Sequence, residues 1–154
     1  MKISLLKAPT DPNPNADRCH HSFTYSVYPH TGVVATSDTV KEAYYLNKPL
    51  KAYKIDANPN GSLESTFSFV SSDKKNAVID TVKLSENGEG YVVRVYDCAG
   101  TKTYPTLTFG FEIEKAYECD MLENVIGDIP ANANTVDFRL SNFEVKTIFV
   151  KAKK

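Results

Sequence analysis

The sequence predicts a mainly β protein: an antiparallel β-sandwich, with an N-terminal part that belongs to a larger β-sheet domain and one short helix. Three observations support this fold class. After residue 65, short runs rich in Val, Ile, Thr, Tyr and Phe alternate with turn signals and show no helical period. The first half also holds alternating runs, but long polar stretches join them. A segment containing Asn-Pro and Asn-Gly separates the two halves.

Two strands are predicted in the first thirty residues. The apolar run at residues 3–9 ends at a proline. Residues 20–30 alternate, with Phe23, Tyr25 and Val27 on one side of an extended chain. The loop between them is dense in Asp, Asn and Pro, so the connection is long and is not a tight hairpin.

One helix is predicted near residues 39–47. Thr39 can cap its N-terminus, and Glu42 would complete a capping box. Asn47 and Pro49 end it, and one more strand is expected at residues 50–55.

These elements divide the chain into three parts. Residues 1–56 are expected to be the end of a larger, supersandwich-like β-sheet domain, residues 57–64 a linker, and residues 65–154 a small C-terminal β-sandwich. Asn87-Gly88 predicts a hairpin between the second and third strands of that sandwich. Its strands are expected at residues 66–70, 77–84, 91–97, 103–109, 115–120, 135–140 and 144–150.

Composition excludes several classes of protein. The chain has 18 Lys and Arg against 19 Asp and Glu, a formal net charge of −1, so nothing favours nucleic acid or an anionic membrane as a partner. No apolar run approaches the roughly 20 residues that span a bilayer, and no secretory signal is present. Three widely spaced cysteines favour a reducing, cytoplasmic location over a disulfide framework.

Two residue clusters invite a chemical interpretation. Glu112 and Glu114 share one face of a predicted strand, and their Cα atoms would be about 6.6 Å apart. This is near the separation expected for the carboxylate pair of a glycosidase. The alternating Phe111 and Ile113 favour an ordinary solvated face instead. A second cluster, Cys19, His20, His21 and His30, lacks metal-ligand spacing, so a structural or solvent-facing role is favoured and no metal site is predicted.

Exposed aromatic side chains could serve as platforms for a sugar ring. The chain has nine Tyr and eight Phe but no Trp. In a sandwich, most of them are expected in the core or at its rim. The tyrosines that could contact a glycan are Tyr28, Tyr44, Tyr45, Tyr53 and Tyr104.

Five further stretches are informative when taken together, namely residues 3–18, 21–30, 39–50, 76–100 and 143–151. In the same order along the chain, they resemble the C-terminal region of glycoside hydrolase family 38 α-mannosidases of the cytosolic and bacterial type. The resemblance implies a non-catalytic C-terminal β-domain of a retaining, zinc-dependent enzyme that removes terminal α-mannose from glycans. It also implies that the catalytic carboxylates and the zinc ligands lie in an upstream catalytic domain, so this chain holds no catalytic residue and no cofactor.

The resemblance further implies partners within the same polypeptide, namely the catalytic and helical domains, and a mannose-containing glycan as substrate. The β-domain would support the fold and wall the active-site cleft. Lys7 stands where many members of the resembled family have Arg, and a Lys ammonium cannot make the bidentate contact of an Arg guanidinium. The segments that would make contact with the cleft are residues 7–18 and 20–30. Taken as structure alone, the first is a loop and the second a core strand. The candidates for contact with the cleft are Lys7, Asp17, Arg18, His21, Tyr25, Tyr28 and His30.

Two other functions stay open on the sequence. One is a free-standing carbohydrate-binding β-sandwich module that holds glycans on exposed tyrosines. The other is an oligomerisation domain that presents a sheet edge to a second subunit, as in a homodimer.

Overall fold

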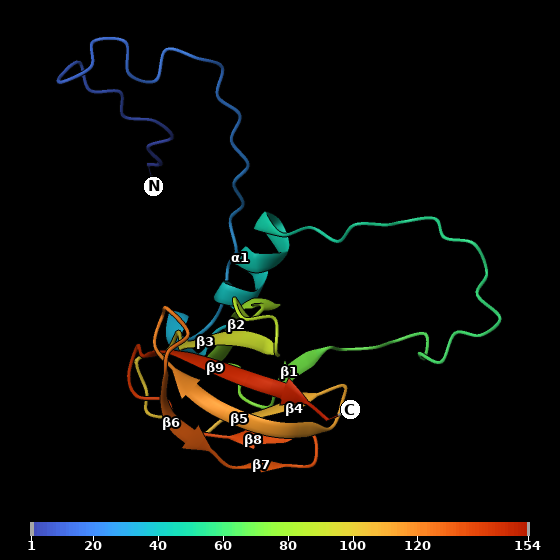
Figure 1. Cartoon of the computed structure of the whole chain (residues 1–154). Coiled ribbons are helices and arrows are strands. Elements are labelled where there is room, and N and C mark those ends of the chain that lie inside the picture. The colour runs from blue at the N-terminus through green and yellow to red at the C-terminus, as the bar shows by residue number, and fades with distance from the viewer. Residues whose placement is uncertain (1, 154) are drawn as a thin grey trace.

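The computed structural model describes residues 2–153 and contains two antiparallel sheets packed as a sandwich (Figure 1). One sheet has the strand order β1-β4-β8-β7 and the other β2-β3-β9-β5-β6. The mainly β fold class is therefore confirmed. The strands are β1 (Val70–Ser72), β2 (Ala77–Leu84), β3 (Tyr91–Asp97), β4 (Thr106–Phe109), β5 (Ile113–Cys119), β6 (Val125–Ile129), β7 (Ala131–Asn132), β8 (Thr135–Asp137) and β9 (Val145–Ala152).

Most strands of the sandwich lie where the sequence predicts them. β2 and β3 have the predicted bounds, and β4, β5, β8 and β9 differ only at their ends. The first strand was predicted at residues 66–70 but starts at Val70. β6 and β7 were not predicted, because Gly127 and Pro130 in this stretch are turn signals in sequence.

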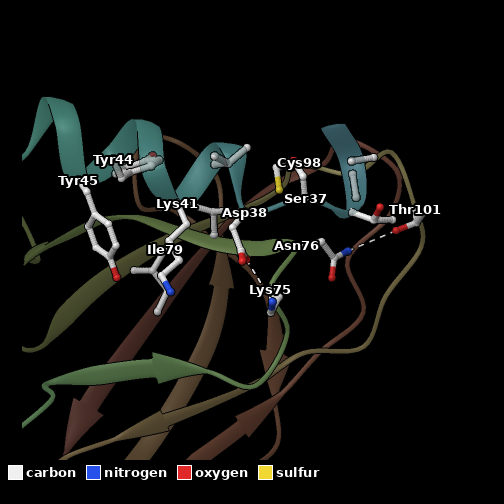
Figure 2. Close-up of a pocket in the computed structure, with 15 residues that line it drawn as sticks. Ser37, Asp38, Lys41, Tyr44, Tyr45, Lys75, Asn76, Ile79, Cys98 and Thr101 are labelled. Atoms are coloured by element: carbon white, nitrogen blue, oxygen red, sulfur yellow. Dashed lines mark hydrogen bonds and ion pairs between the residues drawn. The ribbon is translucent and has the colours of Figure 1, made fainter. Parts of the chain in front are cut away.

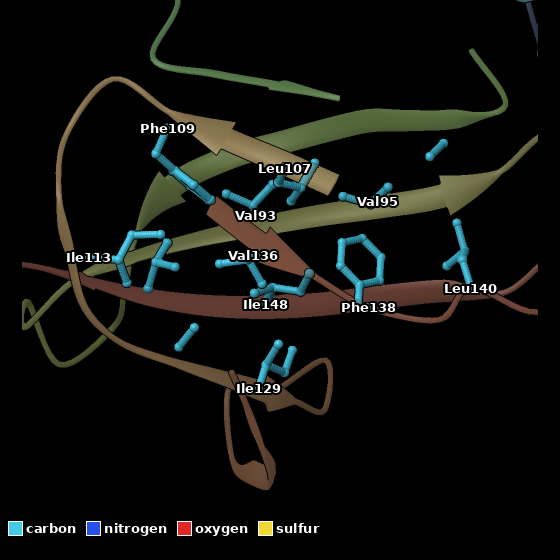
Figure 3. Close-up of a cluster of buried hydrophobic side chains, with 13 residues drawn as sticks. Val93, Val95, Leu107, Phe109, Ile113, Ile129, Val136, Phe138, Leu140 and Ile148 are labelled. Carbon is cyan, nitrogen blue, oxygen red and sulfur yellow. The ribbon is translucent and has the colours of Figure 1, made fainter. Parts of the chain in front are cut away.

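The core lies between the two sheets (Figure 3). Val93 and Ile148 of one sheet and Leu107 and Val136 of the other are each fully buried. Alternate residues of each strand face this layer, which is what the sequence alternation requires. The same side chains account for the regular apolar pattern after residue 65.

The hairpin at Asn87-Gly88 is confirmed. Gly88 has a φ of +72°, which a glycine adopts without strain. The Ser85 amide donates to the Gly90 carbonyl at 3.0 Å and closes the turn. This hairpin fixes the pairing of β2 with β3.

Helix α1 (Thr39–Asn47) has the predicted bounds, and the 3₁₀ turn η1 (Val34–Thr36) precedes it. The predicted capping box is wrong. Asp38 occupies the N-cap position without a side-chain cap bond, and the hydroxyl of Thr39 lies 2.6 Å from the Ser37 hydroxyl. Within residues 2–153, no helix is long and apolar enough to cross a membrane.

The three strands predicted before residue 57 are absent from the described chain. Residues 3–9, 20–30 and 50–55 belong to no strand or helix. In Figure 1 the blue N-terminal segment runs away from the sandwich. A strand needs a neighbouring strand for its backbone hydrogen bonds, and none of the described strands pairs with these segments.

Candidate functional site

The residues predicted to contact a cleft lie on the N-terminal segment and form only local interactions. Arg18 donates to Asn15 Oδ1 at 3.1 Å, and the ring of Tyr28 stacks on that of His30 at 5.9 Å. Each is exposed except His21, which is half-buried. The structure thus brings Tyr28 to His30 and His21 to the backbone of Asp17, and it gathers the candidates into no common site. The exposed members are Lys7, Asp17, Arg18, Tyr25, Tyr28 and His30.

The Cys-His-His stretch does not converge on a metal position. His21 Nε2 lies 2.9 Å from the Asp17 carbonyl oxygen and 3.6 Å from Cys19 Sγ. In the part of the chain that the structure describes, no group of three or more His, Cys, Asp or Glu side chains could hold a metal ion. The described residues therefore do not fit a zinc site.

Glu112 and Glu114 are engaged in separate ion pairs. Glu112 accepts from Lys153 Nζ at 2.8 Å, and Glu114 lies 3.4 Å from Lys151 Nζ. The hydrogen bond from Lys153 lowers the pKa of Glu112, which keeps it ionised at neutral pH. Both carboxylates are exposed. These features fit the solvated face that the alternation favoured.

The structure instead forms a groove between α1 and the sandwich, with a volume of about 570 Å³ (Figure 2). Pockets of this size commonly hold small ligands. Residues from η1, α1, the β1–β2 turn, β2 and the β3–β4 loop meet there. The lining residues are Ala35, Thr36, Ser37, Asp38, Val40, Lys41, Tyr44, Tyr45, Lys75, Asn76, Val78, Ile79, Cys98, Ala99 and Thr101.

Two side-chain contacts hold α1 against the sandwich. The Tyr44 hydroxyl donates to Asp80 Oδ1 at 2.9 Å, and Lys75 Nζ pairs with Asp38 Oδ1 at 3.1 Å. The hydrogen bond from the neighbouring Thr81 hydroxyl, followed by that from Tyr44, lowers the pKa of Asp80. Asp80 is therefore ionised and a strong acceptor for the tyrosine at neutral pH.

Asp97 shapes the loop at one end of the groove. Its side chain is 2% exposed and accepts from Asn76 Nδ2 at 2.8 Å and from the amides of Ala99, Thr101 and Phe143 at 2.9 to 3.2 Å. Burial opposes ionisation, but these hydrogen bonds outweigh it and hold the pKa of Asp97 below its usual value. The charged carboxylate thus fixes the loop that carries Ala99 and Thr101.

The same loop holds Cys98, whose thiol is not activated. Burial, and then the charge of Asp97, raise the pKa of Cys98. A thiol with a raised pKa is a poor nucleophile at neutral pH. Cys98 therefore contributes to the groove wall through packing.

Sequence reasoning named Tyr44 and Tyr45 as possible glycan contacts and did not find the rest of the groove. The lining residues come from three separate stretches, near residues 35–45, 75–79 and 98–101. The one available signal was the half-apolar face of the predicted helix, which must cover something.

Known proteins match this chain over most of its length. Residues 76–148 match the family model described as "Glycosyl hydrolases family 38 C-terminal beta sandwich domain". Alpha-mannosidase G of Dictyostelium discoideum is 32% identical over 94% of this chain, and Alpha-mannosidase 2C1 of Homo sapiens is 29% identical over 97% of it. The matched regions are 14% and 15% of those two proteins, so the chain spans about one seventh of their length.

The architecture agrees with the family match. Residues 76–148 run from the start of β2 into β9 and include eight of the nine strands. The matched region is therefore the sandwich itself. This chain belongs to glycosyl hydrolase family 38, as a C-terminal β-sandwich domain.

Proposed function

We propose that this chain is the non-catalytic C-terminal β-domain of a larger α-mannosidase, an enzyme that hydrolyses terminal α-mannose from glycans. The observation that carries the proposal is the match of the sandwich to a family-38 C-terminal domain. The relatives named as α-mannosidases, which are several times longer than the region they share with this chain, support it.

The chemistry of the whole enzyme would then lie in other domains. A retaining mechanism and zinc dependence are properties that we assign to the catalytic domain of the same polypeptide. The role left to this chain is to support the fold and to wall the cleft.

The N-terminal segment would complete a β-sheet in the preceding domain. Phe23, Tyr25 and Val27 alternate in sequence and are 46%, 62% and 65% exposed. Residues 1–56 would thus form the end of that larger domain, and the seven cleft candidates would lie on it. We also propose that the enzyme acts in the cytoplasm, where the free thiols of Cys19 and Cys98 would stay reduced.

Turnover measurements test the main proposal. The purified 154-residue chain with added zinc should not hydrolyse an aryl α-mannoside, whereas a longer polypeptide that contains it should. Removing residues 65–154 from the longer polypeptide should lower its thermal stability. Turnover that co-purifies with the 154-residue chain would contradict the proposal.

A pair of substitutions tests the strand assignment in the longer polypeptide. Phe23→Asp would place a charge on the buried face of the strand and should lower the melting temperature by several degrees. Residue 24 would point to the other face of the strand, so Thr24→Asp should leave the melting temperature nearly unchanged. Equal effects of the two changes would argue against a sheet formed by residues 20–30.

A homodimer is a second role that the structure allows. β2 and β6 are the outer strands of the larger sheet, and Leu84 and Ile126 on them are each 64% exposed. Exposed apolar edge strands favour association with another sheet. Sedimentation of the longer polypeptide at several concentrations would detect such a dimer.

A further inference from the structure

We propose that the groove beneath α1 binds a neutral saccharide unit. The groove itself is argued from geometry alone. The choice of an α-mannoside as its ligand rests on the proposed function.

One wall of the groove is apolar and carries an aromatic platform. Val40, Val78 and Ile79 supply aliphatic surface. The ring of Tyr45 extends down from the helix at one end of the groove (Figure 2). Tyr45 is 58% exposed, so one face is available to a ligand. A pyranose ring has an apolar C–H face that packs on such surfaces.

The other side of the groove is a row of polar groups. Figure 2 shows Lys41, Asp38, Lys75 and Asn76 following one another beneath the helix. Asn76 uses its Nδ2 to bond Asp97 and Thr101. Its Oδ1 accepts from no other described residue, so it is free to accept a hydrogen bond from a ligand.

Donors and acceptors are interleaved along this row. Lys41 Nζ lies 5.6 Å from the centroid of the Tyr45 ring and forms no ion pair with another described residue. Asp38 is a carboxylate acceptor that shares only Oδ1 with Lys75. Each sugar hydroxyl is both a donor and an acceptor, so vicinal hydroxyls suit such a row.

The groove is also held in shape before any ligand arrives. The hydrogen bond between Tyr44 and Asp80 holds the helix in place. The hydrogen bonds that Asp97 accepts hold the loop that carries Thr101. Side chains that are already positioned cost less entropy to order on binding. A weak ligand such as a single sugar can therefore bind measurably.

Titration followed by NMR tests this proposal on the 154-residue chain. Methyl α-mannoside should shift the backbone amides of Lys41 and Ile79 and the side-chain amide of Asn76, with a Kd in the millimolar range. Tyr45→Ala should weaken binding by roughly three- to tenfold, because a ring contact is lost. Asp38→Asn should also weaken it, because a charged acceptor is replaced.

Tyr104→Ala is the matched control. Tyr104 is also exposed, at 61%, and Lys102 lies 5.4 Å from its ring centroid, but it lies outside the groove. This change should leave the Kd unaltered. No shifts at the groove, or equal losses from both tyrosine changes, would overturn the proposal.

Cyclohexanol serves as a probe of similar ring size with a single hydroxyl. It should bind much more weakly than the mannoside if the polar row is used. Equal binding would overturn the saccharide assignment. These outcomes are independent of the hydrolysis test, because a family-38 domain could fail to bind sugar here while the enzyme remains active.

Discussion

At the scale of single residues, Asp97 is the charged group on which most of the local structure depends. It accepts four hydrogen bonds while only 2% exposed. We expect Asp97→Asn to lower the free energy of unfolding by roughly 2 kcal/mol, because charge-assisted bonds are lost and one amide group would face backbone donors. Urea unfolding at pH 7 measures this change.

The pH dependence of the free energy of unfolding, compared between the wild type and Asp97→Asn, tests the same interaction more sharply. The folded pKa of Asp97 lies below that of the unfolded chain, roughly 3.9. Its stabilisation is therefore complete above the unfolded value and is lost as the pH falls through the folded pKa. The difference between wild type and Asp97→Asn should shrink on acidification. Asp128→Asn, at an exposed position, should change stability by less than about 0.5 kcal/mol.

Gly90 is a residue whose missing side chain is required. A Cβ there would lie 2.4 Å from the Val150 carbonyl oxygen and 2.7 Å from the Phe149 ring. Gly90→Ala should therefore cost about 1–3 kcal/mol, because β9 would have to move. Gly127→Ala is the control, since a Cβ there meets nothing within 4 Å. Equal melting temperatures for the two variants would show that β9 can shift freely.

At the scale of elements, α1 is held to the sandwich mainly through its side chains. Tyr44→Phe removes the hydrogen bond to Asp80. We expect faster hydrogen exchange in α1 with little change in the melting temperature, because no residue of α1 is buried. Tyr45→Phe, which removes a hydroxyl that bonds no described residue, should leave exchange unchanged. An unchanged rate in Tyr44→Phe would mean that other contacts hold the helix.

The elements also show what the sequence could predict. β2 and β3 were found because their alternation is long and Asn87-Gly88 supplies a specific turn. β6 was missed because it is an edge strand with a central glycine, and strand propensity depends strongly on such context. Residues 20–30 alternate well, yet form no strand without a neighbouring strand beside them.

The candidate site was much less predictable than the fold. The site contains an ion pair between Asp38 and Lys75, and hydrogen bonds from Asn76 to Asp97 and Thr101. These contacts connect positions separated by 21 to 37 residues, and nothing in the local pattern encodes them. The placement of α1 against the sandwich brings Asp38 to Lys75, and the pairing of β2 with β3 brings Asn76 to Asp97.

At the scale of the whole molecule, the N-terminal segment contributes nothing to the two core clusters. Removing residues 2–33 should therefore change the melting temperature by less than about 2 °C. Self-association should fall, because the segment carries eight of the exposed large apolar side chains. Differential scanning fluorimetry and sedimentation velocity measure these two effects.

A substitution provides the control for this deletion. Phe23→Ser with Val27→Ser in the 154-residue chain should also reduce self-association without altering the melting temperature. A fall of more than about 5 °C on deletion would show that the segment packs on the sandwich.

The central position of β9 has a consequence for biosynthesis. β9 pairs with β3 on one side and with β5 on the other, although it is the last strand in sequence. Until β9 leaves the ribosome, β3 can pair only with β2 and β5 only with β6. The larger sheet is therefore completed only after β9 emerges. A nonsense mutation between Asp120 and Val145 would leave β3 and β5 each with an unpaired edge, and cellular quality control would meet the product as a misfolded protein.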